Sequence, residues 1–170
     1  MSFLDFAKER FSCRKFSDKP VESENVDKII EACLAAPTAV NFQPFKIFIF
    51  NSEKSIEKVA KATPYTFGAK LIFAVGADSK NSFVRKFDNK NGAEIDAAIV
   101  GTHLMLEVHD LGLGTTWVGY FNPNVLKEEF PQLKDYDIVG LYPVGYPADD
   151  AAPSPIHSKS KTKEELVQVL

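Results

Sequence analysis

The longest apolar pattern in the chain runs from Ala93 to Phe121 and organises the rest of the sequence. Its first part has helical periodicity, with the polar residues in one narrow stripe at 3.6 residues per turn: Asp96, His103, Glu107 and Asp110. The remaining surface of this helix is apolar, which predicts burial on several sides, in a core or between subunits. Gly112 is expected to end the helix, because glycine adopts the left-handed conformation at little cost. Residues 115–121 are β-branched and aromatic and predict a short strand, in which Gly119 would let a ligand approach the backbone closely.

Helical and strand patterns alternate along the rest of the chain. Apolar residues at helical spacing predict a short first helix capped by Ser2, and further helices from Val26 to before Pro37, over 52–62 and over 124–130. Continuous apolar runs predict buried strands at 45–50, 71–75 and 138–146. Pro143 suggests an edge or irregular position in the last of these strands.

Two segments lack any clear period. Residues 78–92 are polar and irregular, and they are a candidate lid or disordered loop. Residues 148–170 form a C-terminal arm, expected to lie extended on the surface and to end in a helical stub at 164–170. The alternation elsewhere predicts one layered helix–sheet–helix domain spanning residues 1–170.

The composition is that of a globular protein without a membrane span. Hydrophobic residues make up 45% and charged residues 25% of the sequence, values typical of a globular domain. The N-terminal segment has no apolar signal core and no apolar run approaches the length of a membrane span, so we expect a soluble cytoplasmic protein. Cys13 and Cys33 stand twenty positions apart without a CxxC motif, and we expect them to be free thiols.

The net charge of −3 is unevenly distributed. Residues 8–19 carry five basic and two acidic side chains, and residues 151–163 carry three lysines and no acid, so each segment has a balance of +3. Two short basic segments in an otherwise acidic chain indicate a small anionic ligand between them, not a nucleic-acid surface. The alternative is that both are solvated, basic chain ends.

Most familiar catalytic motifs are missing from the sequence. It contains no GxSxG, no Walker loop and no GxGxxG after a strand, so dinucleotide binding of the Rossmann type is not indicated. His103, Glu107 and Asp110 share a helix face and could hold a metal, but one helix with this set is more typical of a solvated or salt-bridged stripe. We therefore expect no metal site.

Three motifs, in order and at matching spacing, resemble those of one family. RFSCRKF, at 10–16, resembles the R-x-S-x-R-x-F signature that opens the FMN-dependent nitroreductases. APTAVNFQPF, at 36–45, is similar to their AP-S/T-x-x-N-x-QPW loop, with Phe45 in place of the tryptophan. GLGTTWVGYF, at 112–121, is similar to their GLGTCWVG segment. The resemblance implies an α+β, three-layer α/β/α fold with a central mixed, mainly antiparallel sheet, in a domain-swapped dimer.

The resemblance also assigns cofactor-binding roles. The FMN phosphate and isoalloxazine edge would be bound by Arg10, Ser12 and Arg14, since guanidinium groups suit phosphate. The partner subunit would contribute Pro37, Thr38, Ala39 and Asn41, with Gln43 near the ribityl chain or ring edge. The flavin ring would be lined by Trp117, Val118 and Gly119. The family's tail commonly offers an arginine to the phosphate, and here either Lys159 or Lys161 would take that place.

The activity implied is that of a homodimeric oxidoreductase with its FMN sites at the subunit interface. It would pass hydride from NAD(P)H through the flavin to a nitroaromatic, quinone or similar small-molecule acceptor by a ping-pong mechanism. Because flavin N5 is the reactive centre, no catalytic side chain is expected. Two alternatives stay open: another flavin reaction on the same scaffold, such as flavin reduction or a dehalogenase-like reaction, and a flavin-binding or storage protein without turnover.

Overall fold

A four-stranded sheet forms the centre of the computed structural model, which describes residues 2–170; Met1, the first residue of the expected domain, lies outside the described residues. The strand order is β1-β2-β6-β5. The strands are β1 (Phe45–Phe50), β2 (Leu71–Ala77), β5 (Gly114–Thr115) and β6 (Asp137–Gly145). Each pair of neighbouring strands is antiparallel, and Ser12 adds a parallel bridge to Thr115. The predicted mixed, mainly antiparallel sheet is therefore confirmed.

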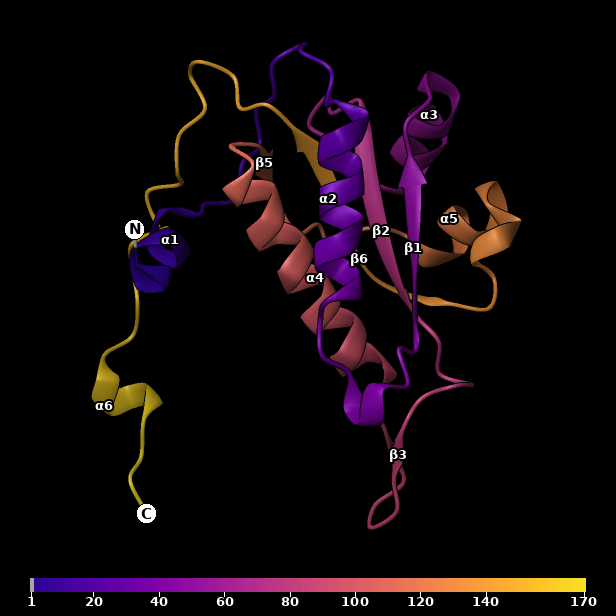
Figure 1. The fold of residues 1–170 in the computed structure, drawn as a ribbon. Helices are drawn as coiled ribbons and strands as arrows, with labels where there is room; N and C mark the ends of the chain where they lie inside the picture. The colour runs from indigo at the N-terminus through magenta and orange to yellow at the C-terminus, as the bar shows by residue number, and fades with distance from the viewer. Residues whose placement is uncertain (1) are drawn as a thin grey trace.

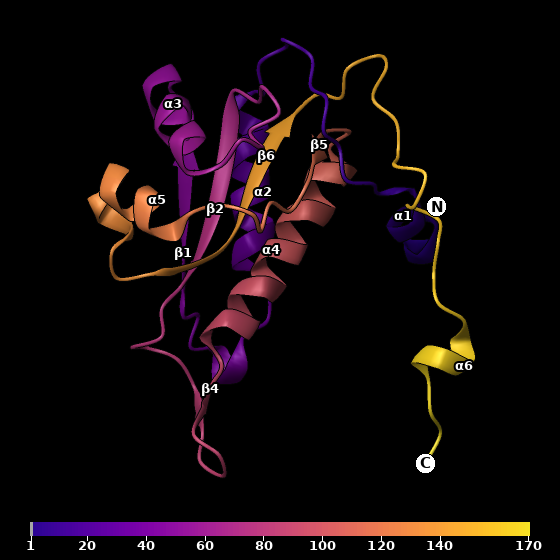
Figure 2. The ribbon, with the colours of Figure 1, turned by 180° about the vertical axis from the view of Figure 1, so that it is seen from behind.

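Helices cover both faces of this sheet. On one face lie α2 (Ser23–Leu34) and α4 (Ala93–Asp110), and on the other lie α3 (Glu53–Ala62) and α5 (Pro123–Glu129) (Figures 1 and 2). The shorter helices are α1 (Phe3–Glu9), η1 (Ala39–Asn41), η2 (Pro131–Leu133) and α6 (Lys163–Leu166). The three-layer α+β arrangement agrees with the prediction, while the domain-swapped dimer stays a prediction.

The alternation of side chains along β2 explains why the chain needs both helical layers. Phe73 and Val75 pack into the core under α2 and α4, whereas Ile72 and Ala74 pack into the core under α3 and α5. Successive side chains of a strand point to opposite faces, so a strand covered on both sides must be apolar throughout. All seven residues of β2 are buried, as its continuous apolar run indicates.

The helix ends follow local sequence signals. Ser2 and Asp5 form the expected capping box at the start of α1. The side chain of Asn122 accepts hydrogen bonds from two backbone N–H groups at the start of α5. Gly112 follows α4 with a φ of 69°, the left-handed conformation expected of it.

The strand predicted over 115–121 is only partly formed. β5 ends at Thr115, and the chain rejoins the sheet through a single bridge between Val118 and Leu141. Between them, the indole N–H of Trp117 donates to the Val139 carbonyl at 3.0 Å, and the ring lies against Gly140. The bulky indole occupies the space over β6, so the backbone at residues 116–117 does not form regular strand pairing there.

Pro143 lies inside β6, between β2 and β5, where the sequence predicts an edge or irregular position. It is paired with Ile72 of β2. On the other side, the pairing to β5 involves Val144 and Gly145, and the next bridge is at Leu141. The proline therefore sits opposite the interrupted part of the neighbouring segment, where its missing N–H breaks no ladder.

Residues 78–92 have regular structure, in contrast to the irregular loop expected. They form a hairpin from β3 (Val84–Arg85) and β4 (Lys90–Asn91). The Ser82 hydroxyl donates to the Asn91 side-chain carbonyl at 2.6 Å, and Arg85 pairs with Asp88 across the turn. These short-range bonds order a segment that has no hydrophobic period. Phe87, in the turn, has a fully exposed side chain.

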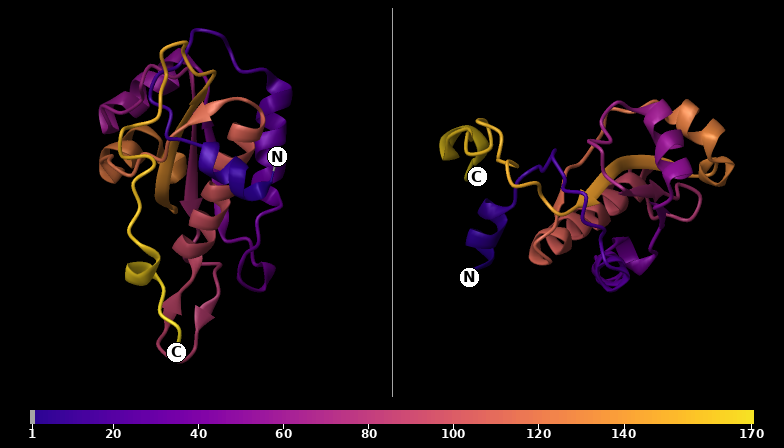
Figure 3. Two further views of the ribbon diagram at one scale, coloured as in Figure 1. Left: turned by 90° about the vertical axis from the view of Figure 1, so that its left-hand side faces the viewer. Right: turned by 90° about the horizontal axis from the view of Figure 1, so that it is seen from above.

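The N-terminal helix and the C-terminal arm stand away from this body (Figure 3). Phe3 and Leu4 of α1 are largely exposed, as are Val169 and Leu170 at the end of the arm. The arm is extended, as predicted, although α6 is shorter than the expected stub. No helix in residues 2–170 is both long and apolar enough to cross a membrane.

The contact between α4 and β6 leads to a first prediction. A Cβ at Gly101 would lie 2.0 Å from the hydroxyl oxygen of Tyr142, whose side chain is fully buried. We therefore expect Gly101→Ala to lower the free energy of unfolding by about 1–3 kcal/mol, the usual cost of overpacking. Chemical denaturation measures this change directly.

The matched control is Thr102→Ala, at the exposed neighbouring position of the same helix, which should change stability by less than about 0.5 kcal/mol. Tyr142→Phe in the Gly101→Ala background should recover part of the loss, because it removes the atom that clashes. A Gly101→Ala protein as stable as the control would contradict this account of the helix–sheet contact.

Candidate functional site

Two hollows share Arg14 as a lining residue. One, of about 250 Å³, is lined by Tyr65, Phe67 and residues 116–120 together with Arg14. The other, of about 390 Å³, is lined by Ser12, Lys15 and residues 150–155, again together with Arg14. The first has aromatic and backbone walls, and the second has cationic and hydroxyl groups. Together they suit a ligand with a flat ring system at one end and an anionic group at the other.

The segment carrying Arg14 is held against β5 by its backbone. The N–H of Cys13 donates to the Thr115 carbonyl at 2.9 Å, and the Cys13 side chain is fully buried. A Cβ on Gly114 would lie 2.7 Å from the Cys13 sulfur, so this close approach requires glycine in β5. Burial raises the pKa of the Cys13 thiol, which keeps it a neutral packing group.

The charges of this segment are only partly compensated. Lys15 is paired with Asp150. Neither Arg10 nor Arg14 forms an ion pair with a carboxylate within residues 2–170, and Arg14 donates only to the Ser12 carbonyl, at 3.2 Å. Two guanidinium groups without carboxylate partners near a hydroxyl are suited to bind an anion. Of the first predicted group, Ser12 and Arg14 line the hollows, whereas Arg10, at the end of α1, lines neither.

The aromatic hollow is built by a loop that the sequence patterns do not single out. The hydroxyl of Thr63, buried after α3, donates to the Tyr120 carbonyl at 2.7 Å and accepts from the Tyr65 N–H at 3.2 Å. The rings of Tyr65 and Tyr120 then meet edge to face at 5.7 Å. Residues 63–68 have no hydrophobic period, and only their aromatic content could have indicated a role.

Gly119 and Trp117 occupy this hollow differently. A Cβ built on Gly119 would meet no other atom within 4 Å, so the protein's own packing does not require a glycine there. Val118 is buried beside it and pairs with Leu141. The Trp117 indole is anchored to β6 by its N–H, with its ring 5.2 Å from that of Tyr142. Trp117 therefore holds the backbone of the hollow in place, in addition to lining it.

The second predicted group lies at the other end of α4. The Ala39 N–H donates to the carboxylate of Asp96, in the first turn of α4, whereas β5 follows the last turn of the same helix. Asp96 and Asp110 are fourteen residues apart, which at about 1.5 Å per residue places them about 21 Å apart. Pro37, Thr38, Ala39, Asn41 and Gln43 are therefore remote from the hollows at Arg14 of the same chain.

Asp96 departs from the stripe expected on α4. Asp96 is only 4% exposed, whereas Asp110 at the end of the helix is exposed. Glu107 is half-buried, and burial, with a smaller contribution from Asp110, raises the pKa of its carboxyl. The polar positions of α4 thus do not form one solvated face.

The two tail lysines lie on the arm. Lys159 and Lys161 are exposed, and neither forms an ion pair with a described carboxylate of its own chain. The arm contacts α1 through the His157 ring, whose Nε2 lies 3.1 Å from the Lys8 carbonyl oxygen. Neither lysine lines the hollows at Arg14.

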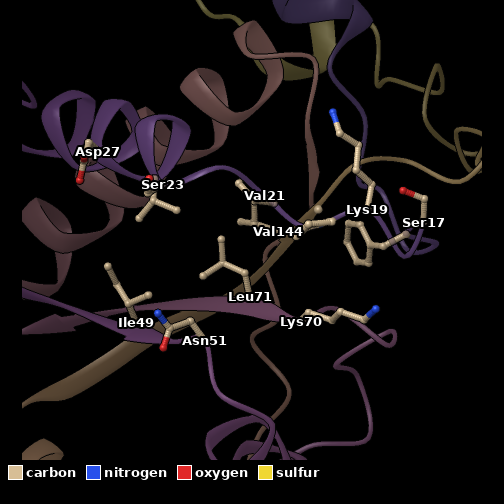
Figure 4. Close-up of a pocket in the computed structure, with 14 residues that line it drawn as sticks. Ser17, Lys19, Val21, Ser23, Asp27, Ile49, Asn51, Lys70, Leu71 and Val144 are labelled. Atoms are coloured by element: carbon tan, nitrogen blue, oxygen red, sulfur yellow. The ribbon is translucent and has the colours of Figure 1, made fainter.

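A further cavity, of about 360 Å³, lies between the start of α2 and the sheet (Figure 4). Its wall is apolar around Val21 and Leu71. The two lysines at its rim are already paired, Lys70 with Asp18 at 2.9 Å and Lys19 with Glu22 at 3.2 Å. It contains none of the predicted site residues, and Asp27 is the one charged group in its lining without an ion pair among residues 2–170. A carboxylate does not suit an anionic ligand, so the site at Arg14 is the better candidate.

Comparison with known proteins is consistent with this geometry. A nitroreductase family protein of Clostridium difficile 630 has a crystal structure that matches 99% of this chain and 98% of its own, with 33% identity and a TM-score of 0.91. The FMN reductase [NAD(P)H] of Bacillus subtilis is 30% identical over 85% of this chain, which spans 65% of that protein's length. A provisionally named nitroreductase of Exiguobacterium sibiricum, solved in complex with FMN, shares the fold at 20% identity and a TM-score of 0.86, with 100% of this chain and 98% of that one covered.

A model of the nitroreductase family matches residues 7–65 and 64–146, which together cover the sheet, both helical layers and the segment around Arg14. The chain therefore belongs to the nitroreductase family.

Proposed function

We propose that this protein is an FMN-dependent oxidoreductase that takes electrons from NAD(P)H and delivers them to a small oxidised acceptor, such as a nitroaromatic or a quinone. The observation that carries the proposal is the pair of hollows that share Arg14 in their linings. Support comes from the three sequence motifs, from the family membership, and from relatives whose names or complexes include FMN and NAD(P)H.

The residues around Arg14 fit the chemistry of FMN. A phosphate needs cationic and hydroxyl donors, which Arg14 and Ser12 provide in the second hollow, where the Asp150 carboxylate is already paired with Lys15. Arg10, two residues before Ser12, would add a second guanidinium. A flat tricyclic ring needs a wall without protruding side chains, which the open space at Gly119 provides. Bound there, the flavin would supply the hydride-accepting centre that no side chain of this protein can replace.

The chain's own contribution is position and electrostatics. Arg14 lines both hollows, and its guanidinium would place positive charge at the edge of the ring, where preorganised charge is most effective. The paired aromatic rings of Tyr65 and Tyr120 border the ring hollow and would restrict water there. No side-chain acid or base is assigned a step.

Each site would be completed by a second copy of the chain. The Thr38–Gln43 loop cannot reach the Arg14 of its own chain across about 21 Å of α4. An antiparallel pairing of two chains would bring the loop of one to the hollows of the other, twice, by symmetry. The exposed Phe3 and Leu4 of α1, and Leu170 on the arm, are apolar surface that such a dimer would cover.

We expect the purified protein to be yellow, with about one FMN per subunit, and its flavin absorbance to fall on anaerobic addition of NADH or NADPH. Arg10→Ala and Arg14→Ala should each weaken FMN binding by about 1.5–3 kcal/mol, since each removes hydrogen bonds to a charged group. Fluorescence titration of the apoprotein measures this. Lys46→Ala, on β1 and outside both hollows, is the control. A colourless protein that gains no flavin absorbance in excess FMN would refute the proposal.

Gly119→Ala separates ligand binding from folding. The new methyl group meets no protein atom, so the melting temperature of the apoprotein should stay within about 2 °C of the original. It would project into the ring hollow, and we expect FMN to bind about tenfold more weakly, a loss of about 1.4 kcal/mol. Unchanged affinity would show that the ring does not lie against this backbone.

Mixed dimers test the shared site. Arg14→Ala and Asn41→Ala homodimers should each bind FMN weakly at both sites. A heterodimer of the two variants, isolated through different affinity tags, would have one doubly altered site and one intact site. It should therefore bind half an FMN per subunit with the original affinity. A heterodimer as weak as its parents would mean that Arg14 and Asn41 do not meet across an interface.

A further inference from the structure

Asp96 is a buried acid that none of the sequence motifs includes. It lies in the first turn of α4, 4% exposed, and its Oδ1 accepts a hydrogen bond from the Ala39 N–H at 3.0 Å. Its other oxygen, Oδ2, is buried and has no hydrogen-bond partner among residues 2–170. A position at the start of a helix favours a carboxylate electrostatically, because the helix dipole places partial positive charge there.

The loop that Asp96 contacts contains residues with positive φ values. Val40, Asn41 and Gln43 have φ values of 48°, 56° and 51°. A β-branched residue such as valine rarely adopts the left-handed region, and strained backbone of this kind persists only where the surroundings enforce it.

Bonds within the loop enforce part of this shape. The Gln43 N–H donates to the Thr38 hydroxyl at 3.0 Å, and the Asn41 N–H donates to the Thr38 carbonyl at 3.0 Å. These bonds fix the loop's internal geometry but not its place on the protein. Among the described residues, the Asp96 carboxylate is the only side chain outside the loop that forms a hydrogen bond with residues 38–43.

We propose that Asp96 is a positioning residue that fastens the Thr38–Gln43 loop to the start of α4, and so presents Asn41 and its neighbours for ligand binding. This inference rests on the proposed function for the purpose it gives to the loop. Within the described chain, the Ala39 N–H is the one donor to the carboxylate. If the loop left its place, the carboxylate would lose its one hydrogen bond within the described chain, and the Ala39 N–H would lose its acceptor.

The same arrangement relates the two predicted groups of residues. One end of α4 holds the loop through Asp96, and the other end leads through Gly112 into β5 and the hollows at Arg14. A buried helix is a rigid spacer, and the hydrogen bond at its start ties the loop, whose two ends continue into α2 and β1, to that spacer. Asp96 would thus act on the ligand through the loop, without touching it.

Three variants and a control isolate this bond. Asp96→Ala removes the acceptor, while Asp96→Asn keeps a carbonyl oxygen at the same place. Ala39→Pro removes the donor and leaves Asp96 intact, and the extended backbone of Thr38, with φ −131° and ψ 159°, is compatible with a following proline. Glu94→Gln is the control, because Glu94 is an exposed acid in the same turn of α4.

Hydrogen exchange of the flavin-free protein is the first measurement. We expect Asp96→Ala and Ala39→Pro to raise exchange of the amides at 40–43 by about tenfold or more, with β2 unchanged. Asp96→Asn should restore most of the protection, and Glu94→Gln should match the original protein. Loop exchange that Asp96→Ala leaves unchanged, or that rises only in step with β2, would overturn the inference. Ala39→Pro gives the deciding result if Asp96→Ala does not fold.

FMN titration is the second measurement. Asp96→Ala and Ala39→Pro should weaken binding by about tenfold, and Asp96→Asn should recover most of it. Loss of affinity with unchanged loop exchange would overturn the positioning role. If the original protein binds no FMN, the proposed function fails, while the exchange experiment still decides whether Asp96 holds the loop.

Discussion

Close packing of α4 against the sheet is the contact on which the other parts of the molecule depend. Gly101 leaves room for the Tyr142 hydroxyl, and the Trp117 ring fits over Gly140. Small residues on one element thus accept large aromatic rings from the next, which brings helix and strands close together and leaves little freedom to slide. Because α4 is held in this way, the segments attached to its two ends, the loop at 38–43 and β5, are also held in place.

The two ends of α4 have different chemistry. At the start, a buried carboxylate receives a backbone N–H from a strained loop. After the end, a glycine turn leads to a strand whose neighbour carries uncompensated guanidinium groups. Both arrangements lower the stability of the fold, because one contains strained backbone and the other contains guanidinium groups without carboxylate partners. Such departures from local consistency concentrate at functional positions.

Most of the fold could be predicted from sequence because its signals are local. The strand at 45–50, the capping box at Ser2 and the stop at Gly112 each depend on a few adjacent residues. Predictions were incomplete where distant residues decide the outcome: of the two positions expected for Pro143, an edge or an irregular one, only the folded chain shows that the irregularity lies in the segment opposite β6. The burial of Asp96 depends on a loop more than fifty residues away. The motif residues could be named by resemblance, whereas the Tyr65 loop could not, because only the folded chain brings it to Tyr120.

The length of α4 also has a consequence for mass action. In the proposed dimer, two groups of residues about 21 Å apart in one chain would serve one ligand only after two chains meet. Ligand binding and association are then thermodynamically linked, so that each promotes the other to the same degree. The apparent affinity for the ligand would depend on the concentration of the protein itself. The ligand would dissociate from dilute chains. A higher protein concentration would raise the bound fraction of ligand without any change in the site.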